Sequence, residues 1–141
     1  MTQRVWALCP FSRPERLHTV LAEFRAQTYG NKGLVLVENK GALGACAAAG
    51  VIPDLLLRSE PHQSWAKNTG LAELDPDDWF VTWDDDDHRG PGALEEVAQA
   101  AAPGVVLGKA SFFMRLNDGR LIRFRRPDGM LWGGTLAARV G

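Results

Sequence analysis

The residues of this chain best suited to chemistry are four consecutive aspartates followed by a histidine, at positions 84–88. They come directly after the apolar, β-prone run WFVTW at 79–83, which lies between turn-forming segments and predicts a buried strand. Like charges this close repel one another, and an apolar strand beneath them lowers the local dielectric. The run therefore needs a cation or many hydrogen-bond donors, and a hard divalent metal ion with oxygen ligands suits it.

Strand geometry predicts how these side chains divide. Successive residues of an extended chain point to opposite sides, so Asp84 and Asp86 are expected on one face and Asp85 and Asp87 on the other. The aspartates also suit a simpler role, because acidic residues favour helix starts and a helix is expected from near Pro91. The sequence leaves both a metal site and a helix-capping turn open.

The composition is that of a globular protein, and we expect a single domain over residues 1–141. Sixteen basic residues against seventeen acidic ones give a net charge of −1, so no overall field recruits nucleic acid or anionic lipid. Cys9 and Cys46 lack the spacing of a zinc site or a disulfide framework and are expected to be buried thiols. With no signal-peptide or transmembrane pattern, the expected location is cytoplasmic. A homo-oligomer stays open.

Apolar runs that alternate with amphipathic helices predict an α/β fold, Rossmann-like, with a mostly parallel central sheet and helices on both faces. The expected strands are 5–9, 34–37, 54–58, 79–83 and 105–108. The expected helices are 14–27, 64–74 and 92–102, with a weak helix in the alanine-rich segment 42–50. A C-terminal antiparallel hairpin, with strands 112–116 and 121–125 around a two-residue Asp-Gly loop, precedes a last strand at 131–136. Ser12 is expected to cap the first helix, and Trp65, Asn68 or Thr69, and Ala72 are expected to face inward from the second.

Ligands of open parallel sheets bind outside the carboxyl ends of the strands. Three of the expected strands end in polar residues able to recognise a base, a ribose and a metal-bound pyrophosphate. The first is followed by Pro10, Phe11, Ser12 and Arg13, the second by Glu38 and Asn39, and the fourth by the aspartates. The sequence therefore predicts a nucleotide site where these strand ends meet.

With its segments in this order, the chain resembles the family 2 glycosyltransferases of the GT-A fold over nearly its whole length. The similar segments are CPFSRPERL at 9–17, AQTY at 26–29, VLVEN at 35–39, AKNTG at 66–70, the aspartate run, which is similar to the family's D-x-D signature, and GGT at 133–135. The resemblance implies a GT-A domain that binds a nucleoside diphosphate sugar with Mn²⁺ or Mg²⁺ and transfers the sugar to an acceptor, whose identity stays open.

The resemblance also implies roles for individual residues. The base and ribose would lie against Pro10, Phe11, Ser12, Arg13, Glu38 and Asn39. Lys67 would lie near the diphosphate and Asp85 near the ribose. Asp84 or Asp86 would bind the metal ion, whose Lewis acidity stabilises the leaving diphosphate. Ser12, Lys67 and the Glu38-Asn39 pair depart from the family pattern, so the base stays open.

An inverting transfer needs a general base within reach of the acceptor hydroxyl. The family carries an acidic base in a segment beyond the GGT region, where this sequence ends, so Asp87, His88 and Asp128 are the candidates here. We expect slow transfer by this chain alone, and the main alternative is a non-catalytic or partner-dependent module that binds nucleoside diphosphates. A nucleotidyltransferase is a second alternative, but it would more often show a glycine-rich phosphate loop after the first strand, where this chain has PFSR.

Two further groups of residues have both a binding and a structural interpretation. The expected hairpin carries a basic patch that either contacts a phosphate or an acidic acceptor or simply faces solvent. Its arginines are Arg115, Arg120, Arg123, Arg125 and Arg126. Most tryptophans are expected in the core, although Trp65 or Trp132 would suit stacking on a base or a sugar.

Overall fold

The structure is a computed structural model that describes residues 3–38, 53–59, 62–109, 111–125 and 136–141. The strands of its larger sheet are β1 (Val5–Phe11), β2 (Lys32–Glu38), β3 (Leu55–Arg58), β4 (Trp79–Thr82) and β7 (Ala137–Arg139). They lie in the order β3-β2-β1-β4-β7, with β1 to β4 mutually parallel and β7 antiparallel to β4. The predicted α/β fold with a mostly parallel sheet is confirmed.

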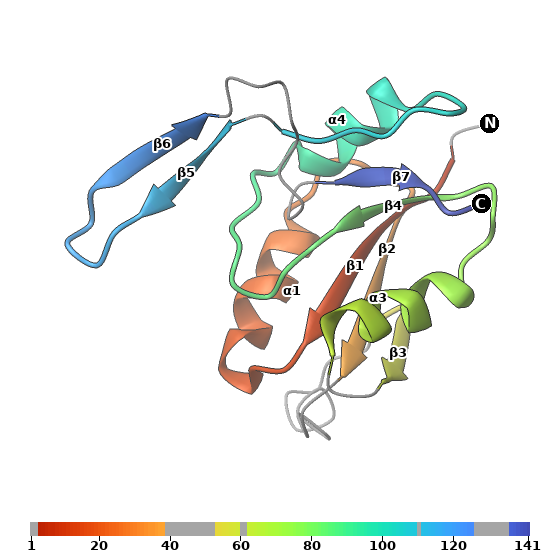
Figure 1. Ribbon diagram of the computed structural model, residues 1–141, viewed down its shortest axis with the longest axis horizontal. Coiled ribbons are helices and arrows are strands. Elements are labelled where there is room, and N and C mark those ends of the chain that lie inside the picture. Colours follow the sequence, from red (N-terminus) through yellow and green to blue (C-terminus); the bar gives the residue numbers. More distant parts are fainter. Residues whose placement is uncertain (1–2, 39–52, 60–61, 110, 126–135) are drawn as a thin grey trace.

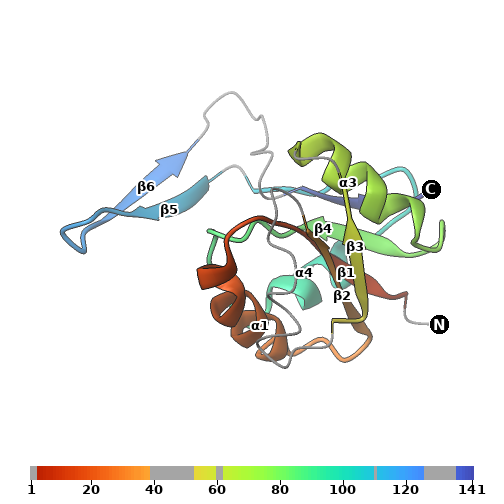
Figure 2. The same cartoon turned by 90° about the horizontal axis from the view of Figure 1, so that it is seen from below.

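Helices cover both faces of this sheet (Figures 1 and 2). A short 3-10 helix, η1 (Pro14–Arg16), leads into α1 (Leu17–Arg25), and α3 (Gln63–Ala72) and α4 (Ala93–Ala100) follow. Alternate residues of β1 divide between two apolar clusters, because side chains of a strand point to opposite faces. Cys9 and Phe11 pack with α1 and α4, whereas Trp6 and Leu8 pack with α3. Continuous apolar strands are therefore explained by burial on both faces.

Small residues set the packing of α3 on the sheet. Ala66 is fully buried, and a Cβ added to Gly70 would lie 2.3 Å from Leu8 Cδ1, so the helix approaches β1 closely at this glycine. Trp65 lies about a quarter turn of the helix from Ala66, and its side chain is 57% exposed. The expectation that Trp65 and Ala72 face inward is wrong, because both are exposed and the helix contacts the sheet through Ala66, Gly70 and Leu71.

Strand β1 continues through Pro10 and Phe11, which were expected in a loop. The backbone oxygen of Leu8 accepts a hydrogen bond from the nitrogen of Trp83 (2.9 Å), so alternate residues of β1 face β4. The nitrogen of Pro10 points to that same side, beyond Thr82, where β4 ends. The proline therefore costs the sheet no ladder hydrogen bond.

The first helix also begins differently from the prediction. Its first turn is the 3-10 helix η1, whose N-cap residue is Arg13 and has no side-chain hydrogen bond to the helix. Ser12, the predicted cap, lies one residue earlier and donates its backbone N–H to Asp85 Oδ2 (3.4 Å). Ser12 thus contacts the distant aspartate run and does not cap the helix.

The predicted hairpin is confirmed as β5 (Ser111–Arg115) and β6 (Leu121–Arg125). Its turn has three residues rather than two, because Leu116 and Arg120 still bond across it through Leu116 N and Arg120 O (2.8 Å). Gly119 has a φ of +86°, the left-handed conformation that ends such a turn.

The end of the sheet differs from the expectation. Within the described residues, Leu107 forms only an isolated bridge with Ala137, so 105–108 is not a strand. The last strand is Ala137–Arg139; residues 131–135 and the expected weak helix 42–50 lie outside the described residues. Among the described helices, none is long and apolar enough to cross a membrane.

Candidate functional site

The polar strand ends lie along one edge of the sheet. Because β1, β2 and β4 are parallel, Ser12 after β1, Glu38 at the end of β2 and the aspartates after β4 emerge on the same side. The register places Phe11 opposite Glu38 and Leu8 opposite Thr82, so the three chain ends are neighbours. The structure thus brings together the segments that were predicted to form a site, except Asn39, which lies outside the described residues.

The four aspartates form a turn and not an extended strand. Asp87 donates its backbone N–H to the oxygen of Asp84 (3.3 Å), which reverses the chain at Asp85 and Asp86. Asp85 and Asp86 consequently bind the same guanidinium group instead of pointing to opposite faces. The predicted division of alternate aspartates between two faces is therefore wrong.

The segment between β1 and α1 binds the buried aspartate of this turn. Asp85 is 4% exposed, and its carboxylate lies 2.9 Å from Arg13 Nη2. Arg16 Nε donates to the backbone oxygen of Asp85 (3.1 Å), so its peptide group is fixed as well. The same Arg13 nitrogen lies 3.1 Å from Asp86 Oδ2. The hydrogen bond with Asp86 and the charge of Asp85 raise the pKa of Arg13, which therefore stays charged.

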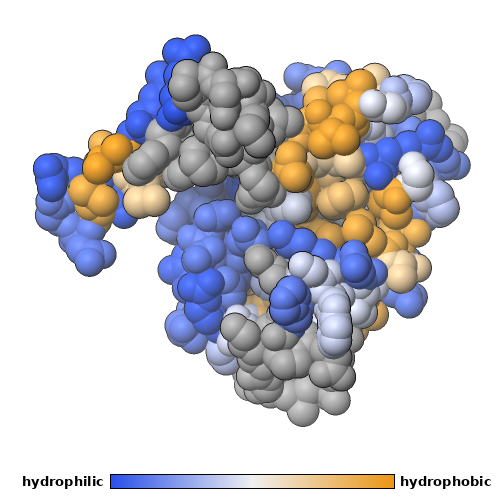
Figure 3. Space-filling model, in the orientation of Figure 1, coloured by the Kyte–Doolittle hydropathy of each residue, from blue (hydrophilic) through white to orange (hydrophobic). Residues whose placement is uncertain are grey.

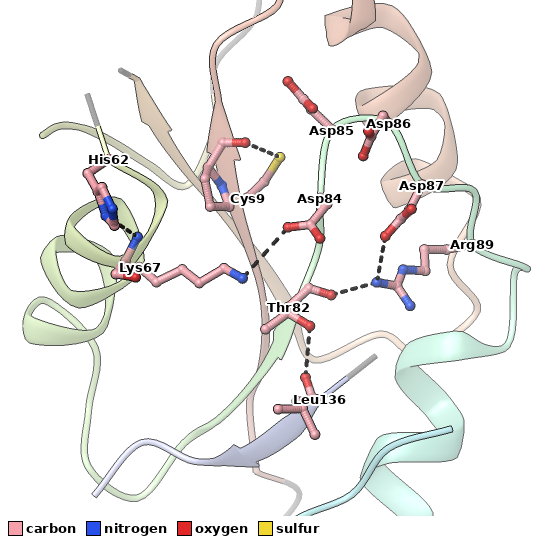
Figure 4. A network of polar contacts seen from close by, with 12 residues as sticks. Cys9, His62, Lys67, Thr82, Asp84, Asp85, Asp86, Asp87, Arg89 and Leu136 are labelled. Atoms are coloured by element: carbon pink, nitrogen blue, oxygen red, sulfur yellow. Dashed lines mark hydrogen bonds and ion pairs between the residues drawn. The ribbon is translucent and has the colours of Figure 1, made fainter. Parts of the chain in front are cut away.

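Two further cations approach the turn from opposite sides (Figure 4). Lys67 on α3 places Nζ 3.8 Å from Asp84 Oδ1. Arg89 lies after the turn and places Nη2 3.8 Å from Asp87 Oδ2 and 2.8 Å from the backbone oxygen of Thr82. Its guanidinium also lies 5.6 Å from the ring centre of Trp83, a cation–π distance.

Arg13, Lys67 and Arg89 together offset most of the negative charge of the four aspartates. The sequence alone indicated an uncompensated acidic run, whereas the folded turn has three cations within 4 Å of its carboxylates. Arg89 was missed by sequence reasoning, although its position directly after the run was a usable signal. Any anionic ligand of this edge therefore finds cationic side chains already in place.

The aspartates do not cap helix α4. The N-cap residue of α4 is Gly92, without a side-chain cap, and the N–H of Leu94 donates to Gln27 Oε1 (3.1 Å). Gln27 also donates to the oxygen of Gly90 (2.8 Å), so Gln27, two residues after the end of α1, and not the acidic turn satisfies the start of α4. The helix-capping interpretation of the run is therefore wrong.

Asp84 and Asp86, the predicted metal ligands, provide carboxylate oxygens at a partly open position. Their side chains are 21% and 52% exposed. Within the described residues, no three acidic, histidine or cysteine side chains gather closely enough to bind a metal ion by themselves. This donor set fits Mg²⁺ or Mn²⁺ that takes one or two carboxylates and completes its shell with water and phosphate oxygens. It does not fit a closed cage made by the protein alone.

Glu38 is the most unusual group of the edge. Its side chain is 5% exposed, and its Oε1 atom is buried without a hydrogen-bond partner among the described residues. A buried acceptor without a donor costs about 1–3 kcal/mol, and more when it is charged. A ligand that brings an N–H or O–H donor to this atom would recover that cost.

Two of the three candidate general bases, His88 and Asp87, have partners within the fold. His88 Nδ1 lies 2.6 Å from Glu23 Oε1, and the other oxygen of Glu23 accepts from the N–H of Arg89 (3.0 Å). Burial raises the pKa of Asp87; Arg89 lowers it, and the charges of Asp84 and Asp86 raise it further. The third candidate, Asp128, lies outside the described residues. Sequence reasoning missed Glu23, for which no local signal exists.

An Asp87→Asn variant should melt at a higher temperature than the wild type at neutral pH. Because the pKa of Asp87 is raised in the folded state, the folded chain binds this proton more tightly than the unfolded chain does. The ionised carboxylate therefore costs stability as the pH rises through the folded pKa. The difference in melting temperature between the variant and the wild type should shrink as the pH falls towards about 3.9, the ordinary pKa of aspartate. Melting curves of both proteins across this range measure the effect, and a difference independent of pH would contradict it.

A cavity of about 210 Å³ adjoins the acidic turn on the α4 side. Trp83 and Arg89 line it at the end nearest the turn, and Val97, Leu107 and Ala137 form apolar walls. Because Arg89 also pairs with Asp87, a molecule in this cavity would lie close to a candidate base.

No family model matches the chain, and no curated protein matches it. What this edge of the sheet does is therefore inferred from its residues and from the order of the sequence motifs.

Proposed function

We propose that the chain binds a nucleoside diphosphate sugar, together with Mn²⁺ or Mg²⁺, at the carboxyl edge of β1, β2 and β4, and that it acts in glycosyl transfer as a GT-A domain. The observation that carries the proposal is the convergence of Glu38, the Ser12-Arg13 segment, Lys67 and the aspartate turn on one edge. These groups suit the three parts of such a donor, and they are the segments that resemble the family 2 glycosyltransferases.

Each residue has a role that follows from its charge and burial. Glu38, buried and with one oxygen unpaired within the described part of the chain, accepts a hydrogen bond from the base or the ribose. Lys67, which approaches Asp84 from α3, would interact with the diphosphate, and Arg13 would lie against the base or the ribose. Asp84 or Asp86 would bind the divalent cation, which supplies Lewis-acid stabilisation of the leaving diphosphate.

The acidic turn is preorganised for this role. Asp85 is fixed at its carboxylate by Arg13 and at its backbone by Arg16, so the chain direction at Asp84 and Asp86 is determined before a ligand arrives. Fixed dipoles and charges stabilise a developing charge without reorganisation. The acceptor would occupy the cavity beside Arg89, from which Asp87 is the nearest candidate base.

A second candidate function is nucleoside diphosphate binding without efficient transfer. It is favoured by the pairing of Asp87 with Arg89 and of His88 with Glu23, since a base engaged with a partner in the fold is less available to an acceptor hydroxyl. The two functions share the donor site and differ in the chemistry that follows binding.

The test is a binding screen of nucleoside diphosphates and nucleoside diphosphate sugars against the purified chain, with Mn²⁺, with Mg²⁺ and with a chelator. We expect at least one nucleotide to raise the melting temperature in the presence of metal and to have little effect in chelator. Release of nucleoside diphosphate from the bound sugar donor then separates the transferase from the binding module. The absence of any metal-linked shift across all bases would refute both.

A further inference from the structure

The β5–β6 hairpin projects away from the rest of the fold (Figure 1). Among the described elements, β5 and β6 make their extensive contacts only with each other. An isolated two-stranded hairpin is at best marginally stable in water, and it needs a further surface to cover its apolar side chains. The nucleotide site does not use this hairpin.

Large apolar side chains near the tip of the hairpin are exposed. Met114 and Ile122 are cross-strand partners and are 44% and 40% exposed, and Leu121, opposite Arg115, is 59% exposed. Figure 3 shows this apolar patch bordered by hydrophilic residues at both ends of the hairpin. Leu121 lies on the opposite face of the hairpin from Met114 and Ile122, because adjacent residues of a strand point to opposite faces. Apolar side chains therefore lie on both faces near the turn.

The hairpin also concentrates positive charge. Residues 111–125 contain four arginines and one aspartate, whereas the rest of the chain contains twelve basic and sixteen acidic residues. Arg115, Arg123 and Arg125 are exposed, and Arg120 pairs with Asp118 across the turn (2.7 Å). The partner that fits is therefore anionic, and a second hairpin of the same kind would be repelled.

The size of the hairpin excludes a stable protein interface made by it alone. Two strands of five residues, at about 3.3 Å per residue and about 10 Å across, present roughly 170 Å² per face. A standard protein interface needs about 800 Å² from each partner. A lipid surface has no such requirement, because it can receive apolar side chains from both faces of a tip while arginines contact the headgroups.

We propose that the β5–β6 hairpin docks on an anionic lipid surface, with Met114, Leu121 and Ile122 at the depth of the headgroup boundary and the arginines on lipid phosphates. The hairpin would lie within the headgroup layer, where apolar side chains of both faces contact lipid and the charged pair at the Asp118 turn stays hydrated.

Co-sedimentation with vesicles tests this proposal on the full chain. The wild type should sediment with vesicles that contain phosphatidylglycerol, should not sediment with phosphatidylcholine alone, and should be released by high salt. Arg123→Gln should weaken the partitioning by roughly fivefold, the effect of one basic residue near such a surface. Leu121→Ser should also weaken it, and both variants should keep the wild-type melting temperature because the side chains are exposed.

Matched substitutions outside the hairpin serve as controls. Arg25→Gln removes an exposed arginine of α1, and Val106→Ser removes another exposed apolar side chain, 58% exposed; neither should change vesicle binding. Failure of the folded wild type to bind anionic vesicles, or equal losses in the controls, would overturn the proposal. It would also be overturned by a concentration-dependent dimer that Leu121→Ser dissolves, or by tighter binding to a single-stranded oligonucleotide than to vesicles.

Discussion

An Asp86→Asn variant is expected to lose the joint stabilisation by metal and nucleoside diphosphate while keeping its fold. Asp86 is the most exposed carboxylate of the turn that pairs with Arg13, and it is a predicted metal ligand. A ligand at about 100 times its dissociation constant adds roughly 2.7 kcal/mol to folding stability. For a domain of this size that corresponds to a melting shift of roughly 5–10 °C. The shift should be close to zero in the variant, as measured by melting curves with and without Mn²⁺ and the nucleotide.

The matched control for this variant is Asp77→Asn. Asp77 is also exposed and also pairs with an arginine, Arg139, but it precedes β4 and therefore lies at the opposite end of the strand. This control should keep the full metal-linked shift. The metal-free Asp86→Asn protein should have nearly the stability of the wild type, since Asp86 is half exposed and Arg13 keeps its ion pair with Asp85. If nucleoside diphosphates bind equally well in chelator, or if Asp86→Asn keeps the shift, the proposed role of the turn is wrong.

The central sheet was predictable because its signal is local. Runs such as 34–37 are apolar at every position, which is the pattern of a short strand buried on both faces. The errors arose where a distant group decides the outcome. Pro10 stays in β1 because β4 ends before it. Ser12 does not cap the helix because it lies one residue before the N-cap position, Arg13, and its backbone N–H donates to Asp85. The close approach at Gly70 decides which side of α3 faces the sheet. The hydrophobic pattern of the helix does not indicate this side.

The candidate site was predictable to the level of segments but not of contacts. Parallel strands deliver their carboxyl ends to one edge, so the positions of Ser12, Glu38 and the aspartates follow from the fold class. The ion pairs do not follow from it. Asp85 and Asp86 share Arg13 only because the chain reverses direction at these two residues. Four consecutive aspartates have no sequence pattern that distinguishes a turn from an extended end of a strand.

Substitution of Glu38 is expected to change stability and binding in opposite directions. Its Oε1, buried and without a hydrogen-bond partner among the residues that the structure describes, destabilises the ligand-free chain, so Glu38→Leu should raise the melting temperature. Glu38→Gln should be intermediate, because the amide removes the charge but stays polar. Relief of about 1–3 kcal/mol corresponds to several degrees in a domain of this size. A control substitution at an exposed glutamate, Glu73→Gln, should leave the melting temperature unchanged.

Nucleotide affinity should fall in the same series, by roughly 10- to 100-fold for Glu38→Leu, because a hydrogen bond to a charged acceptor contributes about 1.5–3 kcal/mol. Glu38→Gln should lose less, since its amide oxygen still accepts a hydrogen bond. Titration calorimetry with the tightest nucleoside diphosphate from the binding screen measures these losses, while melting curves without ligand measure the gain in stability. A purely structural carboxylate would change stability alone. If Glu38→Leu stabilises the chain but binds the nucleotide as tightly as the wild type, the buried carboxylate does not contact the ligand, and the base must bind away from the end of β2.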